Sequence, residues 1–322
     1  MEFYFQIVVV LIGVVGAAAN GLILYALVAS KQHRKHVLIA NQNLLDLVTC
    51  LCLVIVYSLK LCNIYLTGSV GYWLCIMVLS EFPVMTTSVG SVVNLAVITT
   101  ERYLKVVHPV WCQTKHGKWM TYRYSATAFA WIFAIAYNLA VVLPTSTVMD
   151  GACYGYVIWK SETAKVIHFL IYFLSNYVAI LILFIFCYWR IVLIIRQQAR
   201  VMANHGGHGP STASHHIQTN VIKTMIIVSA FYAVAWLPFN VIGLLFVLNP
   251  LPTLPDSSYY ASLLISFLYV CTNPFIYATK FDPVKQVLLR MIPCKKTPEQ
   301  ATGDPTNASR GPMTMGRVQT TG

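Results

Sequence analysis

Seven long apolar runs constrain this chain more than any other feature of its sequence. A helix needs roughly 20 mostly apolar residues to cross the hydrocarbon core of a bilayer, and every run reaches that length. Only 10% of the 322 residues are charged, whereas a soluble domain usually carries about a quarter. We therefore expect an all-α membrane protein, a bundle of seven transmembrane helices. The runs cover residues 5–29, 37–62, 73–106, 124–148, 166–196, 218–248 and 257–279.

The chain after the seventh run changes character. Within residues 281–292, four apolar side chains recur at helical spacing opposite Lys285 and Arg290, which is typical of a short amphipathic helix in contact with membrane lipids. The polar residues that follow cannot bury a core. We expect residues 1–296 to form one transmembrane domain and residues 297–322 to form a disordered tail.

Basic residues are distributed unevenly between the connecting segments. If the N-terminus is outside the cell, all of the 22 Lys and Arg residues except Lys60, Lys160 and Lys165 fall on the inner side. Because cytoplasmic segments carry an excess of basic residues, we expect an extracellular N-terminus and a cytoplasmic C-terminus. The pI near 9.3 reflects this distribution, so we expect no nucleic-acid partner.

One carboxylate lies deep inside a run. An ionisable residue at membrane depth costs a few kcal/mol, so Asp46 in the second run is a functional candidate. It is expected to pair with hydroxyl or amide groups such as those of Ser91 and Asn273. Two interpretations remain open: a site for a small cation, and a carboxylate that is only satisfied by hydrogen bonds.

The third run carries two further carboxylates. Glu81 lies in its outer third, where only a position facing the bundle interior would make it a ligand contact. Glu101 and Arg102 lie at its inner end, where charged side chains also reach the membrane interface without any specific role.

Three of the nine cysteines fall on the expected outer side, where disulfides form. Cys75 at the start of the third run and Cys153 after the fourth would fasten that loop over the mouth of the bundle. Cys62 is a rival partner, and the sequence leaves the pairing open.

Six short motifs occur in order at appropriate runs, and together they resemble the rhodopsin-like (class A) G-protein-coupled receptors over roughly residues 5–295. Any one of them alone would be a weak signal. The motifs are Asn20-Gly21, Asp46, Glu101-Arg102-Tyr103, Trp131, Trp236-Leu-Pro238 and Asn273-Pro274-Phe-Ile-Tyr277.

The resemblance implies a receptor and not an enzyme. Its seven-helix bundle would hold an extracellular ligand at the outer end and admit a heterotrimeric G protein at the inner end. The residues implied in activation and coupling are Glu101, Arg102, Tyr103, Pro109, Tyr188, Trp236, Pro238, Asn273, Pro274 and Tyr277.

The resemblance also assigns roles to single residues. Arg102 would pair with Glu101 at rest and contact the G protein when active, with Tyr188 and Tyr277 supporting it through water. Asp46, Ser91 and Asn273 would form a sodium pocket, and Cys294 would carry a palmitoyl group.

Several positions depart from the family pattern. Gln218 replaces a common acidic partner of Arg102 in the sixth run. This predicts a weak contact between Arg102 and the sixth run at rest, which we call the inner lock, and raised basal activity. Ile180 and Ala235 stand where a proline and a cysteine are usual. Cys75 lies two residues farther from Arg102 than is typical, which predicts a distortion at the outer end of the third helix, near Pro83.

The ligand is restricted by what the sequence lacks. Val84 stands where amine receptors carry an aspartate, and Phe267 stands where visual pigments carry the lysine that binds retinal, so we expect neither ligand. The acidic outer segments favour a basic or amidated peptide, with a melatonin-like or other small molecule as the alternative. The candidate pocket residues are Glu81, Val84, Met85, His168, Trp236, Phe239, Asn240 and Tyr260.

A seven-helix transporter or channel is the rival class. Such proteins usually carry several buried charges along a path, but only Asp46 is clearly buried here. We expect no cofactor other than a possible sodium ion.

Overall fold

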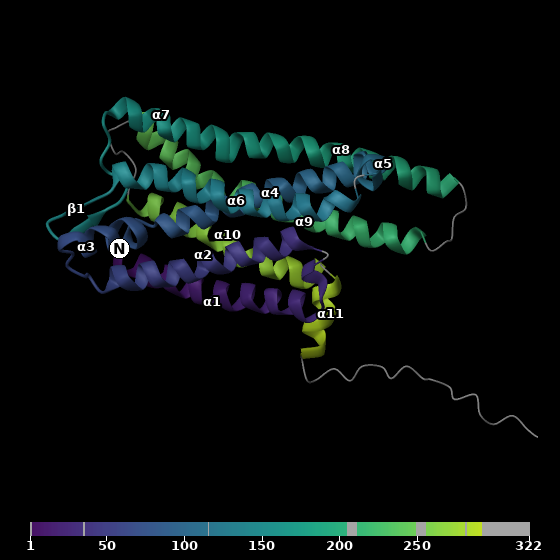
Figure 1. Cartoon of the computed structure of the whole chain (residues 1–322), viewed down its shortest axis with the longest axis horizontal. Coiled ribbons are helices and arrows are strands. Elements are labelled where there is room, and N and C mark those ends of the chain that lie inside the picture. Colours follow the sequence, from purple (N-terminus) through teal and green to yellow (C-terminus); the bar gives the residue numbers. More distant parts are fainter. Residues whose placement is uncertain are drawn as a thin grey trace, which may run out of the picture.

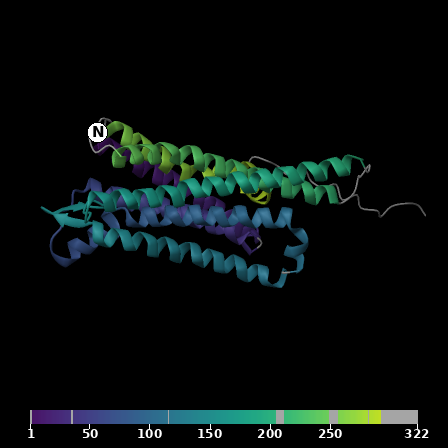
Figure 2. The same cartoon turned by 90° about the horizontal axis from the view of Figure 1, so that it is seen from above.

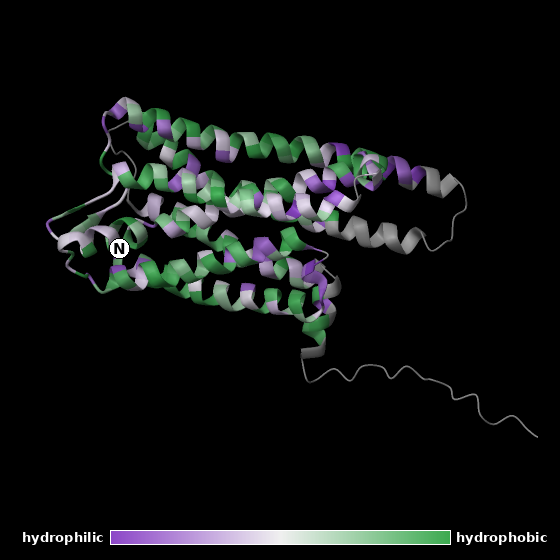
Figure 3. Ribbon diagram, viewed as in Figure 1, coloured by the Kyte–Doolittle hydropathy of each residue, from purple (hydrophilic) through white to green (hydrophobic). Residues whose placement is uncertain are grey.

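The computed structural model describes residues 2–34, 36–114, 116–204, 211–248, 256–280 and 282–291. Within these residues, seven helical spans are long and apolar enough to cross a membrane, and they run side by side along the long axis (Figures 1 and 2). Apolar residues cover most of their length (Figure 3). The predicted all-α membrane bundle is therefore confirmed. The spans are α1 (Glu2–Ala29), α2 (Val37–Leu61), α3–η2–α4 (Gly68–Leu74, Cys75–Leu79, Phe82–Val107), α6 (His116–Thr145), α7–η3–α8 (Glu162–Phe173, Leu174–Val178, Ala179–Asn204), α9 (Ser211–Leu248) and α10 (Asp256–Lys280).

The two ends of the bundle differ. One end, which we call the hairpin end, holds the start of α1, helix α3 and an antiparallel hairpin of β1 (Thr147–Met149) and β2 (Ala152–Tyr154). The other, the α11 end, holds η1 (Gln32–Arg34), α5 (Pro109–Thr114) and α11 (Asp282–Met291), which crosses the axis of α10 (Figure 1). Helix α11 matches the predicted amphipathic segment, whereas Cys294 and the predicted tail lie outside the described residues.

The fourth span ends earlier than the sequence predicted. We expected helix as far as Val148, but α6 ends at Thr145 and the next residues enter strand β1. The reason is a tight turn: Asp150 and Gly151 both have positive φ (50° and 76°) between the paired residues Met149 and Ala152. An Asp-Gly pair is the preferred sequence for this turn, because both residues tolerate positive φ.

The third span is broken near its outer end, as predicted. Residues Cys75–Leu79 form a π-helical turn, and Ser80 N–H donates to the Cys75 carbonyl at 2.8 Å. Glu81 then adopts a left-handed conformation (φ 65°), and α4 starts with Phe82 and Pro83. Pro83 fits there because the first turn of a helix has no intrahelical use for its backbone N–H groups. Because a π-helical turn takes up more residues than an α-helical turn, it accommodates extra residues between Cys75 and Arg102.

A second π-helical turn lies in the fifth span. Although Ile180 replaces the usual proline, residues Leu174–Val178 still form the turn η3. The hydroxyl of Tyr232 donates to the carbonyl of Asn176 at 2.6 Å, and the hydroxyl of Tyr177 donates to that of Ala233 at 2.7 Å. These reciprocal bonds hold η3 against α9.

Small residues allow α1 to approach its neighbours closely. A Cβ at Gly16 would lie 2.5 Å from the sulfur atoms of both Cys50 on α2 and Cys271 on α10. One turn along, the Asn20 amide donates to the Val270 carbonyl at 3.1 Å. Glycine is therefore required where α1, α2 and α10 meet.

Candidate functional site

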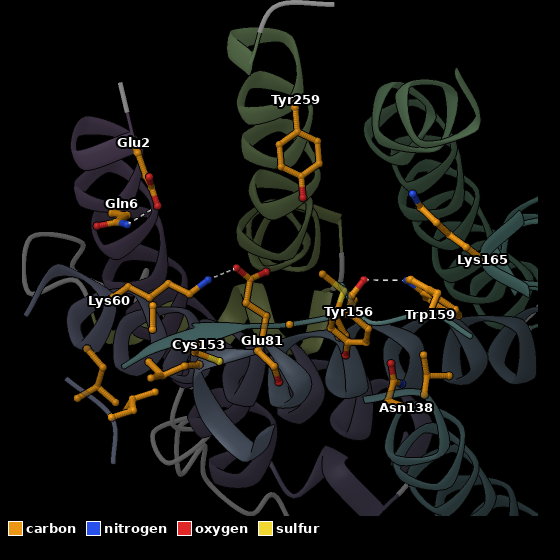
Figure 4. A pocket seen from close by; sticks show the side chains of 18 of the residues that line it. Glu2, Gln6, Lys60, Glu81, Asn138, Cys153, Tyr156, Trp159, Lys165 and Tyr259 are labelled. Atoms are coloured by element: carbon orange, nitrogen blue, oxygen red, sulfur yellow. Dashed lines mark hydrogen bonds and ion pairs between the residues drawn. The ribbon is translucent and has the colours of Figure 1, made fainter. Parts of the chain in front are cut away.

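A cavity of about 820 Å³ opens at the hairpin end between the outer ends of the spans. Figure 4 shows side chains from α1, α2, α10 and the segment after β2 around it. Its walls carry three carboxylates, Glu2, Glu81 and Asp150, and two lysines, Lys60 and Lys165. The remaining lining residues are largely aromatic or apolar, so the cavity offers few charges in a mostly apolar enclosure.

Glu81 lies at the centre of this cavity (Figure 4). The left-handed backbone at the break in the third span places its carboxylate there. The hydroxyl of Tyr57 donates to it at 2.9 Å, and Lys60 forms an ion pair with it. Lys60 also lies over the Tyr57 ring, 4.8 Å from the centroid. The side chain of Glu81 is 17% exposed and that of Lys60 is 27% exposed, so the pair is partly open to solvent.

The hairpin covers one side of the cavity. Cys75 and Cys153 form a disulfide bond between the third span and β2, and Cys62 is a free cysteine exposed at the surface. The amide of Leu66 donates to the Gly151 carbonyl at 2.9 Å, and those of Val157 and Ile158 both donate to the Thr145 carbonyl. The loop is thus fixed at both ends.

The segment after the hairpin adds aromatic residues to the cavity. Trp159 donates its indole N–H to the Tyr156 carbonyl at 2.9 Å, and its ring lies 5.2 Å from that of His168. His168 in turn stacks on Tyr137. Burial raises the pKa of Tyr156, whose hydroxyl is buried with no hydrogen-bond partner among the described residues. This hydroxyl can therefore bond to a ligand.

The cavity contains half of the predicted pocket residues. Glu81, Met85, His168 and Phe239 line it. The other four do not, because their side chains pack elsewhere. Val84 is fully buried in an apolar cluster with Tyr57 and Phe267. The Trp236 ring packs edge-to-face on Phe239, and the Asn240 amide donates to the Trp236 carbonyl. Tyr260 packs on Phe5.

Sequence reasoning missed Lys60, Tyr156 and Trp159. Lys60 was counted only as a basic residue on the outer side. Nothing in its own run of residues indicates that its side chain reaches from α2 to Glu81 in the third span. The two aromatic residues follow Cys153 closely, so the predicted disulfide itself was the signal that this segment lies over the bundle mouth.

At the α11 end, Glu101 is the centre of a buried cluster. Its side chain is 2% exposed and accepts from Lys105 at 2.6 Å, from Arg123 at 2.7 Å and from the Trp119 indole at 3.1 Å. Arg123 and Trp119 belong to α6, so Glu101 joins the third and fourth spans. Arg102, the partner expected from the resemblance, is more distant, with 3.8 Å between the nearest charged atoms.

The structure also gives the hydrogen-bond surroundings of other residues implied in activation. The Tyr188 hydroxyl bonds to Thr99 at 2.9 Å and Ser229 at 3.0 Å. The Tyr277 hydroxyl is fully buried and has no hydrogen-bond partner in the described structure, and the same holds for the Trp236 indole N–H and the Arg102 Nε atom. The expected support of Arg102 by the two tyrosines therefore stays a prediction.

The structure also places the remaining residues that the resemblance implies in activation and coupling. Pro109 starts α5, Tyr103 packs against His108 and Phe186, and Pro238 and Pro274 lie inside α9 and α10. Helix α9 includes Gln218, but its side chain is not described, so the weak inner lock is not tested.

Asp46 is fully buried and satisfied by hydrogen bonds. Its Oδ1 accepts from the Ser91 hydroxyl at 3.0 Å and the Gln42 amide at 3.4 Å, and its Oδ2 accepts from the Asn273 amide at 2.8 Å. Ser91 and Asn273 were predicted partners, whereas Gln42 was missed. Among the described residues, no group of three His, Cys, Asp or Glu side chains is placed to hold a metal ion.

Comparison with known proteins gives consistent matches. The family model described as 7 transmembrane receptor (rhodopsin family) matches residues 19–277. The chain is 23% identical to the melatonin receptor type 1A-A of Danio rerio, over 92% of this chain and 83% of that receptor. It is 25% identical to the human (Homo sapiens) somatostatin receptor type 3, over 93% and 71%. The crystal structure of squid rhodopsin superimposes with a TM-score of 0.73 at 16% identity, over 91% of this chain and 85% of that chain.

Proposed function

The chain belongs to the rhodopsin family of seven-transmembrane receptors, and from this premise we propose how it is oriented and what it binds. It is a multi-pass membrane protein that signals as a G-protein-coupled receptor. We place it in the plasma membrane with the hairpin end outside the cell and the α11 end in the cytoplasm. The excess of basic residues at the α11 end supports this orientation.

The ligand that the cavity favours is a peptide with a basic group. The single observation that carries this proposal is Glu81, a partly exposed carboxylate at the centre of the cavity, paired with a lysine that can leave it. A guanidinium or amine can replace Lys60 there, and charge-assisted hydrogen bonds of this kind are strong. Somatostatin receptors among the relatives are named for a peptide ligand.

A melatonin-like indole is the second candidate. The neighbouring rings of Trp159, His168 and Tyr137, of which His168 and Tyr137 are stacked, offer aromatic contacts to such a ligand. Melatonin receptors recur among the relatives. A retinal ligand is not proposed, because Phe267 is packed against Tyr57 where a lysine would be needed.

The G protein is proposed to bind at the α11 end. Arg102 is the residue proposed to contact it, since the Glu101 carboxylate is held mainly by Lys105, Arg123 and Trp119 and leaves the guanidinium less tightly paired. Ligand binding shifts the receptor to its active form only through different affinities for the two forms. This is a signalling role, and we propose no catalysis.

The test begins with ligand-free G-protein activation in transfected cells, measured with a panel of α-subunit dissociation sensors. We expect Arg102→Ala to abolish activation, whereas Arg190→Ala, which removes an exposed arginine of α8, has no effect. Equal activation by the intact chain and Arg102→Ala contradicts the proposed coupling site.

The ligand is then sought with amidated peptides that carry one Arg or Lys, beside a set of indoles. A peptide response lost in Glu81→Gln at unchanged surface expression supports the first candidate. An indole response that is unchanged in Glu81→Gln supports the second.

A further inference from the structure

A chain of buried polar side chains runs across the bundle from α6 through α2 and α4 to Asp46. The Trp131 indole N–H donates to Asn41 Oδ1 at 3.0 Å, and Asn41 Nδ2 donates to Asn94 Oδ1 at 2.9 Å. Asn94 Nδ2 donates to Gln42 Oε1 at 2.8 Å. Gln42 Nε2 then donates to Asp46 Oδ1 at 3.4 Å. Apart from Trp131, every side chain in this series is at most 6% exposed.

The ends of this series fix the orientation of every amide in it. The indole of Trp131 only donates, so the atom of Asn41 that faces it must be oxygen. The other atom of Asn41 is then nitrogen, and the same reasoning passes through Asn94 to Gln42. The Asn94 amide also donates to the Leu38 carbonyl at 3.0 Å, an acceptor that confirms the assignment independently. Gln42 must therefore present N–H groups, and not oxygen, toward Asp46.

The surroundings of Asp46 consist of hydrogen-bond donors. Gln42 Nε2 donates both to Asp46 Oδ1 and to Ser91 Oγ, and the Ser91 hydroxyl donates to the same carboxylate oxygen. Asn273 Nδ2 donates to the second oxygen. The carboxylate thus accepts three hydrogen bonds from neutral groups of three helices.

A sodium ion, which the family resemblance implies at this position, does not fit these donors. A hard cation is held by several oxygen lone pairs, and N–H groups repel it. The oxygen of Gln42 is used by Asn94, and that of Ser91 accepts from Gln42. Asn273 Oδ1 has no hydrogen-bond partner among the described residues, and one such oxygen beside the carboxylate does not complete a coordination sphere.

We infer that the side-chain amide of Gln42 occupies the place of the ion, so that Asp46 is satisfied without sodium. The stability of the receptor is then independent of sodium. The series from Trp131 to Asp46 joins α6, α2 and α4, and the Asn273 amide adds α10. Gln42 is the residue that determines this independence of sodium. Its replacement by leucine removes both N–H donors, so that Ser91 Oγ no longer accepts from Gln42 and Asp46 Oδ1 accepts only from the Ser91 hydroxyl. Asn94 stays bonded to the Leu38 carbonyl.

The test is the thermal unfolding of the purified full-length receptor in sodium chloride and in choline chloride at equal ionic strength. The intact receptor is expected to unfold at the same temperature in both salts. Gln42→Leu is expected to gain a sodium-specific rise of roughly 2–4 °C, as for a ligand that binds only the folded state. Gln42→Leu with Asp46→Asn is the matched control and is expected to lose that rise.

Two outcomes would overturn the inference. One is a sodium-specific rise in the intact receptor that Asp46→Asn removes. The other is the absence of any sodium effect in both Gln42→Leu and Gln42→Met, where methionine is the second variant in case leucine impairs folding. Neither outcome depends on the ligand or on G-protein coupling, which the basal activation assay measures separately.

Discussion

The third span carries two glutamates twenty positions apart, and they are held in opposite ways. Glu81 lies at a break in the helix, with two donors and a side chain that is 17% exposed. Glu101 lies in regular helix, with three donors at short distance and a side chain that is 2% exposed. The carboxylate proposed to bind a ligand has two partners and is partly exposed, whereas the carboxylate that joins two helices has three close partners and is buried.

The largest difference is expected in stability. Glu101→Ala leaves Lys105, Arg123 and the Trp119 indole without their shared acceptor, and breaking a buried charge cluster costs about 3–5 kcal/mol. Glu81→Ala is the matched variant and is expected to cost less than about 1 kcal/mol, since its pair is partly exposed. Thermal unfolding of the two purified variants measures both. Equal losses would show that the two sites do not differ in the way described.

A smaller difference is expected in ligand potency. Glu81→Gln is expected to weaken a basic peptide agonist about 10- to 100-fold, because a hydrogen bond to a charged group contributes about 1.5–3 kcal/mol. The measurement is a dose-response curve at matched surface expression. An unchanged midpoint would remove Glu81 from the binding site.

Lys60→Gln sharpens the same comparison with the opposite sign. It removes the cation that a basic ligand must displace, so the potency of a basic peptide is expected to rise about two- to fivefold, the range of a partly exposed ion pair. A fall in potency would indicate that Lys60 itself binds an acidic group of the ligand.

A further expected effect, on the pH dependence of stability, concerns His36, at the start of α2 near the Glu101 cluster. Burial, followed by the charges of Arg102, Lys105 and Arg123, lowers its pKa to about 4, against the raising effect of Glu101. Because the folded pKa lies below the ordinary value near 6.5, the unfolded chain binds the proton more readily, and stability falls as the pH drops from about 6.5 toward 4.

His36→Gln tests this by reducing the pH dependence of the unfolding temperature between neutral pH and pH 5. The His108→Gln variant, which changes an exposed histidine just after α4, is the control. An identical pH dependence in the intact receptor and His36→Gln would contradict the prediction.

The sequence indicated the spans, the disulfide candidates and the break near Pro83, because each depends on features within one run of residues. It missed the hairpin, although Asp150-Gly151 is a strong turn signal, because the apolar run continued as far as Val148 and suggested more helix. It also missed Gln42. A neutral amide in an apolar run attracts little attention, and its role depends on Trp131 and Asn94 on other helices.

The misplaced pocket residues have a geometric cause. Counting back from Arg102 gives the depth of Val84 along the helix but not the direction of its side chain, which points into the cluster with Phe267 and Leu263. The same holds for Glu101, whose partners Trp119 and Arg123 are set by how α6 packs on α4. Such contacts follow from the angle between helices, which the pattern of a single run does not contain.

The interruption of the third span also affects how its residue positions are matched with those of related receptors. Two residues of this helix can be compared with the family pattern, Cys75 at its outer end and Arg102 at its inner end. The spacing between them is longer than the family pattern, and the irregular residues between Cys75 and Glu81 lie where the extra length can be accommodated. We therefore expect residues before the interruption to match the family pattern when counted from Cys75, and residues after it when counted from Arg102. A ligand docked from an alignment that counts only from Cys75 would meet Glu81 in the wrong place.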